Sequence, residues 1–129
     1  MSMPAWLTIG SYRGGIIPVK YKRVPCSPKN GGVRFTITGD NENYNFVVIS
    51  NVGGAGSLLS VDVKGSGEWM KMTRNWGQEW QTNDGKLPAN TALSFRITTT
   101  DGENLEFTNA VPDNWKASST KTFPTLIQF

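Results

Sequence analysis

Residues 33–38, Val-Arg-Phe-Thr-Ile-Thr, decide the fold, because apolar and polar side chains alternate along them one by one. Successive side chains of a β-strand point to opposite faces of its sheet, so this alternation predicts a strand with one buried and one solvated face. The pattern recurs at 59–64 and 93–98, and turn signals such as Asp101-Gly102 separate the segments. We therefore predict an all-β sandwich of about eight antiparallel strands.

The second predicted strand, residues 44–52, is largely apolar on both of its faces. Tyr44, Phe46 and Val48 share one face, and Val47 and Ile49 share the other. Such a strand either has the core on one side and a ligand on the other, or lies inside the domain with both faces covered. The alternation alone does not say which face is buried.

Residues 1–29 differ from the rest of the chain. Residues 4–13 place apolar side chains at helical spacing after a proline, which predicts a short helix. Residues 16–24 predict an extended segment that Pro18 confines to the edge of a sheet. Proline and glycine then mark a boundary at 25–32. We expect a partly disordered or edge-strand segment at 1–29, followed by one sandwich domain at 30–129.

The composition limits the location and the classes of partner. No apolar run is long enough for a transmembrane helix, and the N-terminus lacks the basic start, apolar stretch and cleavage site of a signal peptide. Cys26 is the single cysteine, so either the compartment is reducing or the partner thiol lies in missing sequence. Six Lys and Arg residues and no acid precede Phe35, but no aromatic-basic motif accompanies them. We interpret this basic arm as a solvated linker and predict no nucleic-acid partner.

Residues 69–80 hold three of the five tryptophans in twelve residues. A small β domain needs about one large aromatic side chain at its centre, so the others can face solvent and bind a flat ligand. We predict that Trp80 is the core residue and that Trp76, which is followed by Gly77, is exposed. Trp69 turns outward if Met70 and Met72 face the core. Trp115, after a proline turn, is expected to close the edge of the sandwich.

The residue content argues against an enzyme. The chain has no histidine, which removes histidine-based triads and metal clusters, and Cys26 has no imidazole base. A carboxylate pair for glycoside hydrolysis remains an alternative, since Glu68, Glu79 and Asp84 are near the tryptophans in sequence. Nothing in the pattern suggests a buried acid of raised pKa, however. We predict no catalytic residues, no metal and no cofactor.

Six motifs resemble, in order and spacing, the C-terminal half of plant alpha-expansins. They are Ile16-Ile17-Pro18-Val19, Arg23-Val24-Pro25-Cys26, Gly31-Gly32-Val33-Arg34-Phe35, Asn51-Val52-Gly53-Gly54-Ala55-Gly56, Arg74-Asn75-Trp76-Gly77-Gln78 and Val111-Pro112-Asp113-Asn114-Trp115. Residues 30–129 resemble the carbohydrate-binding domain of that family. Residues 1–29 resemble the last helix and strand of the preceding barrel, and Cys26 resembles a cysteine that is paired within it.

The resemblance implies an immunoglobulin-like β-sandwich that lies on cellulose through a line of aromatic side chains. The family loosens plant cell walls without hydrolysing them, which implies an extracellular location in the plant cell wall. Tyr44 and Trp76 fall where the family exposes its sheet-surface aromatics. The implied partners are cellulose and matrix polysaccharides such as xyloglucan, and we expect a monomer that does not insert into membranes.

Two groups of residues make up the predicted polysaccharide-binding site. The aromatic residues are Trp76, Tyr44, Trp69 and Phe46. The residues that could hydrogen-bond sugar hydroxyls are Lys71, Arg74 and Gln81. The alternative function is a protein-binding, allergen-like immunoglobulin-fold module without strong glycan affinity, because the same fold often binds proteins.

Overall fold

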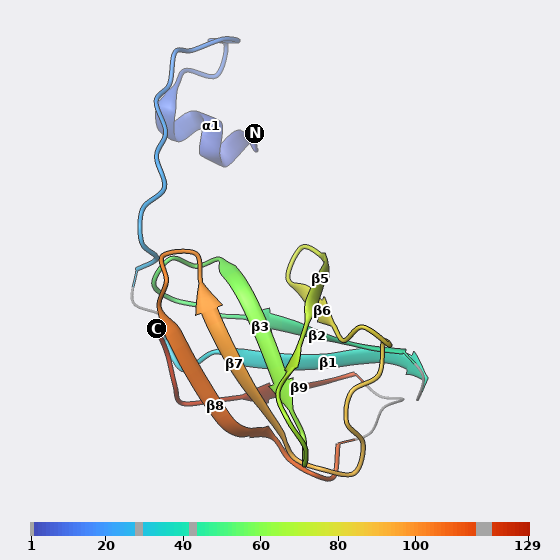
Figure 1. The fold of residues 1–129 in the computed structure, drawn as a ribbon. Coiled ribbons are helices and arrows are strands. Elements are labelled where there is room, and N and C mark those ends of the chain that lie inside the picture. Colours follow the sequence, from blue (N-terminus) through green and yellow to red (C-terminus); the bar gives the residue numbers. More distant parts are fainter. Residues whose placement is uncertain (1, 28–29, 42–43, 116–119) are drawn as a thin grey trace.

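The computed structural model describes residues 2–27, 30–41, 44–115 and 120–129, which form one short helix and two antiparallel sheets (Figure 1). The helix α1 spans Met3–Ile9. The five-stranded sheet runs β5 (Thr73–Trp76), β6 (Glu79–Gln81), β2 (Tyr44–Ser50), β1 (Arg34–Asn41), β9 (Lys121–Pro124). The four-stranded sheet runs β4 (Met70–Lys71), β3 (Leu58–Lys64), β7 (Leu93–Thr99), β8 (Asn104–Val111). The predicted all-β sandwich is confirmed.

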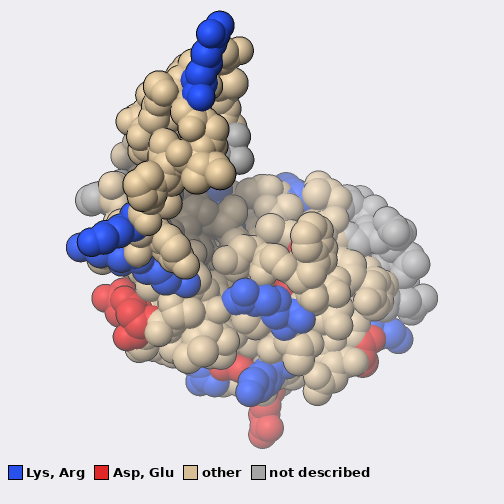
Figure 2. Space-filling view, turned by 90° about the horizontal axis from the view of Figure 1, so that it is seen from above, with Lys and Arg blue, Asp and Glu red and all other residues tan. Residues whose placement is uncertain are grey.

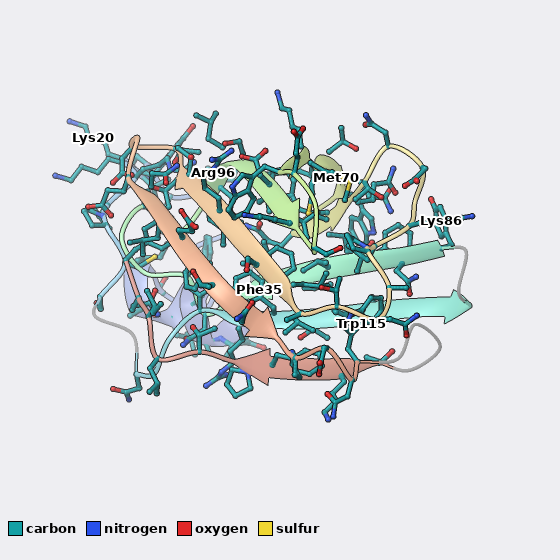
Figure 3. All side chains as sticks on the ribbon, turned by 60° about the horizontal axis from the view of Figure 1, so that its bottom comes forward. Lys20, Phe35, Met70, Lys86, Arg96 and Trp115 are labelled. Atoms are coloured by element: carbon teal, nitrogen blue, oxygen red, sulfur yellow. The ribbon has the colours of Figure 1, made fainter. Side chains whose placement is uncertain are left out.

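The core lies between the two sheets and follows the alternation of the strands. Phe35 on β1 stacks on Phe95 of β7, with ring centroids 4.5 Å apart, and meets Phe107 of β8 edge-on at 5.2 Å. Figure 3 shows Phe35 between the layers. Val47 and Ile49 of β2 are buried beside them. This settles the face that the sequence left open, and Tyr44, Phe46 and Val48 therefore face outward.

The tryptophan-rich stretch changes sheets at Met72. Met70–Lys71 pair with β3, and Thr73–Trp76 then join the other sheet beside β6. Met72 is buried between the layers, and its N–H still donates to the carbonyl of Val61 on β3 at 2.9 Å. A buried side chain at the crossing point thus anchors the switch.

Two tryptophans pack as predicted. Trp80 on β6 is 3% exposed and belongs to the core. Trp115 is half-buried against the core, and its indole N–H donates to the carbonyl of Thr91 at 3.3 Å. It covers the end of the sandwich, where Figure 3 labels it.

The N-terminal segment projects from the sandwich (Figure 1). The predicted helix is present but ends at Ile9, before the end of the helical spacing at residue 13. The extended edge strand expected at 16–24 was wrong as a strand, since in the described structure these residues pair with no other strand. Among its described residues, the segment hydrogen-bonds to the sandwich through Arg23, which reaches the Ser57 hydroxyl at 2.6 Å, and through Cys26, whose N–H donates to the Gly54 carbonyl. The division of the chain at residue 30 stays a prediction.

Basic side chains dominate the charge of this projecting segment. Figure 2 shows them at its tip and where it meets the sandwich, while the body carries both signs. The segment contains no acid that could neutralise them. Its positive charge therefore belongs to the arm and not to either sheet.

An aspartate that caps the turn of the β7–β8 hairpin makes the stability of the domain depend on pH in the acid range. The Asp101 carboxylate accepts hydrogen bonds from the Thr99 hydroxyl and the Glu103 N–H, and these contacts lower its pKa below the ordinary 3.8. The stabilisation is therefore fully present above 3.8 and is lost as the pH falls through the lower folded-state value. We expect urea midpoints to fall below about pH 4 with a slope that is shallower in Asp101→Asn. Identical pH profiles for the two proteins would contradict this assignment.

Candidate functional site

The outer face of the five-stranded sheet carries the exposed aromatic side chains. Strand register pairs Val48 of β2 with Glu79 of β6, and Glu79 with Trp76 of β5. Residues paired across neighbouring strands share a face, so Trp76 lies on the outward face of Val48. Tyr44 and Phe46 share that face by their even spacing from Val48. We call Tyr44, Phe46, Trp76 and the neighbouring Gln81 the aromatic platform.

Trp76 is 74% exposed at the tip of the β5–β6 hairpin. The register closes a two-residue loop between Trp76 and Glu79, and Gly77 in its first position has φ 58°. A positive φ at that position is typical of a type II′ hairpin turn and favours glycine. The turn therefore fixes the indole at the edge of the platform, and the predicted exposure of Trp76 is confirmed.

Tyr44 and Phe46 act as a pair on β2. Their ring centroids are 4.7 Å apart with planes at 87°, so both rings cannot lie flat on one planar ligand. Tyr44 is the more exposed ring at 48%, and its hydroxyl donates to Gln81 Oε1 at 3.3 Å. Phe46 and Gln81 thus hold the tyrosine ring in place, while the tyrosine offers the free surface.

The platform suits a long ligand with flat, weakly polar faces. Trp76 and Tyr44 are two strands and four residues apart in the sheet, which separates their Cα atoms by about 17 Å. That distance spans several sugar rings. The C–H groups on the face of a pyranose can stack on each aromatic ring, with a contribution of about 1 kcal/mol per ring by analogy with aromatic pairs and base stacking.

The structure does not bring Trp69 and Lys71 to this face. Lys71 pairs with Asp62 on the outer side of the four-stranded sheet. Trp69 lies there too, with the Arg96 guanidinium 4.7 Å and the Lys64 ammonium 5.7 Å from its ring centroid. Arg96 also forms a 3.0 Å ion pair with Asp62. Because the chain passes from one sheet to the other at Met72, Trp69 and Lys71 lie on the opposite side of the sandwich from Trp76.

Arg74 is likewise engaged away from the platform. Its guanidinium lies 4.9 Å from the ring centroid of the buried Trp80, and Nη2 donates to the Leu58 carbonyl at 2.5 Å. These contacts tie β5 to β3 and to the core through the buried Trp80, although Arg74 itself is exposed. Of the residues predicted for the site, the structure therefore groups Trp76, Tyr44, Phe46 and Gln81.

Glu79 lies on the platform, although the sequence suggested it only as a catalytic acid. It lies between Val48 and Trp76 in the register, and Asn75 Nδ2 donates to its Oε2 at 3.4 Å. A half-exposed carboxylate there can accept hydrogen bonds from sugar hydroxyls. The two-residue hairpin signal around Gly77 would have placed it beside Trp76.

Asp84, another of the three acids considered for hydrolysis, is suited to a different role. The Asp84 carboxylate accepts hydrogen bonds from the Lys86 N–H at 3.0 Å and the Thr82 hydroxyl at 2.9 Å. The Lys86 N–H and then the Thr82 hydroxyl lower its pKa from the ordinary value. A general acid needs a raised pKa, so Asp84 is a turn-capping residue. In the described residues, His, Cys, Asp and Glu side chains form no group of three that could hold a metal ion.

Comparison with known proteins identifies the relatives of the chain. The family model of the expansin C-terminal domain matches residues 33–112. The chain is 50% identical over 131 residues to Expansin-A13 of Oryza sativa subsp. japonica, covering all of this chain and 48% of that protein. It is 43% identical over 119 residues to Expansin-A24 of Arabidopsis thaliana, covering 92% and 37%. The chain thus spans about half or less of the length of these relatives. The described structure also contains no helix long and apolar enough to cross a membrane.

Proposed function

Because the chain belongs to the family of expansin C-terminal domains, we propose that it is a non-catalytic module that binds cellulose through the aromatic platform. One observation carries the proposal: Tyr44 and Trp76 are both exposed on the same outer face of one sheet. Two rings on a rigid sheet can stack on one glucan chain at little entropic cost, because tyrosine and tryptophan have only two main torsions. Matrix glucans such as xyloglucan share the same sugar faces and are the second expected ligand.

The polar groups of the platform suit a neutral glycan. Gln81 and Glu79 can accept hydrogen bonds from sugar hydroxyls at the sides of the stacked rings. The Glu79 carboxylate would repel an anionic polymer at the same place. Binding through this face should therefore vary little with salt, whereas binding through the basic arm should fade at high salt.

The setting follows from the family, and the activity is part of the proposal. Expansin membership supports the plant cell wall, outside the cell, as the location. The chain covers 48% of the length of Expansin-A13, and we propose that this part binds walls without itself causing them to creep. Extension of heat-inactivated wall strips under load, with and without the protein, tests this; creep above the buffer control would overturn it.

Pull-down on microcrystalline cellulose tests the binding site. Trp76→Ala should weaken binding about fivefold, which corresponds to one lost stacking contact of about 1 kcal/mol. Trp69→Ala removes the same ring from the opposite sheet and should bind like the wild type. Loss of binding in Trp69→Ala with full retention in Trp76→Ala would place the site on the other sheet. Retention by both would favour a protein-binding module.

Activity assays separate binding from hydrolysis. We expect no release of reducing sugar from cellulose, since Asp84 is held ionised and Glu79 lies on an open face. Sugar release by the wild type that disappears in Glu79→Gln would instead establish a hydrolase.

The hairpin glycine offers an indirect test of the same site. An alanine at Gly77, with φ 58°, is strained although a Cβ there meets no atom within 4 Å. We expect Gly77→Ala to cost about 1 kcal/mol of stability and to weaken cellulose binding by displacing Trp76. Gly102→Ala is the matched control, since Gly102 also has a positive φ and open space but lies in the β7–β8 hairpin. An equal loss of binding in both variants would show that only general destabilisation matters.

A further inference from the structure

A second row of polar groups lies beside the aromatic platform. On the same outer face, β1 and the segment 120–122, which leads into β9, present four threonines in two pairs. The hydroxyls of Thr36 and Thr122 are 2.8 Å apart, and those of Thr38 and Thr120 are 3.2 Å apart. We call these four residues the hydroxyl track.

The register places the hydroxyl track on the platform face. Thr36 pairs with Val48 and Thr38 pairs with Phe46, whose side chains both point outward. Thr36 also pairs with Thr122 on β9. One row of the sheet therefore runs Thr122, Thr36, Val48, Glu79, Trp76 across five strands, a width of about 19 Å.

Each threonine pair keeps hydrogen-bonding capacity for a ligand. A hydroxyl has one donor and two acceptor sites, so a pair that shares one hydrogen bond retains one O–H donor and free lone pairs on both oxygens. The pairing also fixes the orientation of the oxygens, and the β-branched side chains have restricted χ1 rotamers. Little conformational entropy remains to be lost when a ligand hydroxyl binds.

The aromatic platform and the hydroxyl track are too far apart to bind the same glucan chain. Strand spacing of about 4.8 Å and about 3.4 Å per residue put the threonine pairs about 10 to 14 Å from the line that joins Trp76 and Tyr44. A sugar ring centred on that line reaches only a few ångströms to either side. The line from Thr36 to Thr120 crosses one strand and moves two residues along the strands, and the line from Trp76 to Tyr44 crosses two strands and moves four residues. The two lines are therefore parallel.

From this spacing we infer that the hydroxyl track binds a second glucan chain that lies beside the one stacked on Trp76 and Tyr44. The preferred substrate is then a sheet of neighbouring chains, the surface of a cellulose crystallite, because a dispersed chain can occupy only the platform. The inference rests on the proposed function, since the first chain must occupy the platform. Thr36 and Thr122 would distinguish ordered cellulose from soluble glucan.

Removal of the hydroxyls tests this inference. Thr36→Val with Thr122→Val keeps the branched shape and removes both oxygens. This variant should lose about fivefold in affinity for microcrystalline cellulose, measured by adsorption isotherm, through lost neutral hydrogen bonds. Its affinity for a soluble β-glucan, measured by affinity electrophoresis, should equal that of the wild type. Thr36→Ser with Thr122→Ser retains the hydroxyls and should bind both ligands normally.

Thr98→Val is the matched control, because it removes a hydroxyl from the outer face of the other sheet and should change neither affinity. Trp76→Ala should lower both affinities, which separates the two proposals. Wild-type adsorption of the double valine variant would show that the threonine pairs only join β1 to β9. An equal loss on both glucans would mean that the threonines contact the stacked chain. Either result overturns the inference, and if Trp76→Ala lowers neither affinity, the proposed function fails with it.

Discussion

Replacing Phe35 by Ala is expected to lower the free energy of unfolding by about 3 to 5 kcal/mol. The side chain is fully buried, stacks on Phe95 at 4.5 Å and meets Phe107 at 5.2 Å, so it joins both sheets at the centre of the core. Truncation removes the buried aromatic surface and leaves a cavity that rigid strands cannot close. Because small domains are stable by only about 5 to 15 kcal/mol, the loss is a large part of the total.

Urea denaturation, followed by tryptophan fluorescence, measures this change. Trp76→Ala is the control, since it removes a larger ring from the surface and should alter stability by about 0.5 kcal/mol or less. A Phe35→Ala variant that unfolds at the wild-type midpoint would mean that the two sheets do not pack through this residue.

Strands whose pattern is local could be predicted from the sequence. Residues 33–38 and 93–98 alternate strictly, and both fall in strands with the expected faces buried. Residues 59–64 also lie in a strand with Val61 and Val63 buried as expected. At its start, however, Leu59 is 64% exposed and Leu58 is buried instead, because the register shifts between Leu58 and Ser60. Side-chain parity is a local property that needs no knowledge of the partner strand. The central tryptophan could be predicted for a related reason, since a small core has room for few indoles.

Elements that depend on distant partners could not be predicted in this way. Residues 16–24 carry a strand-like pattern, but a strand needs a partner strand, and within the described structure no strand pairs with these residues. Conversely, β9 has only four residues and ends in proline, yet it forms because β1 offers an open edge. In both cases the partner decides the outcome, and the segment itself does not.

The site shows the same limit. Trp69, Lys71 and Trp76 are close in sequence, which suggested one surface, but the burial of Met72 moves the chain from one sheet to the other between them. Tyr44 and Trp76 are far apart in sequence and share a face only through β6. Strand order therefore determines which aromatic residues can act together, and alternation does not encode strand order.

Removing both exposed rings of the platform is expected to weaken binding to microcrystalline cellulose about 30-fold, because two contacts of about 1 kcal/mol each are lost. The separation of Tyr44 and Trp76, about 17 Å along the sheet, implies that each ring stacks on a different sugar. The free energy changes should then add, and Tyr44→Ala with Trp76→Ala should equal the sum of the single variants.

Tyr12→Ala with Trp69→Ala controls for this double variant. It removes the same two ring types from outside the platform, and Tyr12 is itself 69% exposed on the N-terminal segment. Its adsorption isotherm should match that of the wild type. If the protein instead adsorbed to cellulose through its exposed apolar side chains in general, both double variants would lose affinity to the same extent. A double variant no weaker than Trp76→Ala alone would show that Tyr44 contacts no sugar. Tyr44 and Trp76 share one face of the sheet, whereas Tyr12 and Trp69 do not. The difference in affinity between the two double variants therefore measures what this arrangement contributes to binding beyond the presence of the rings.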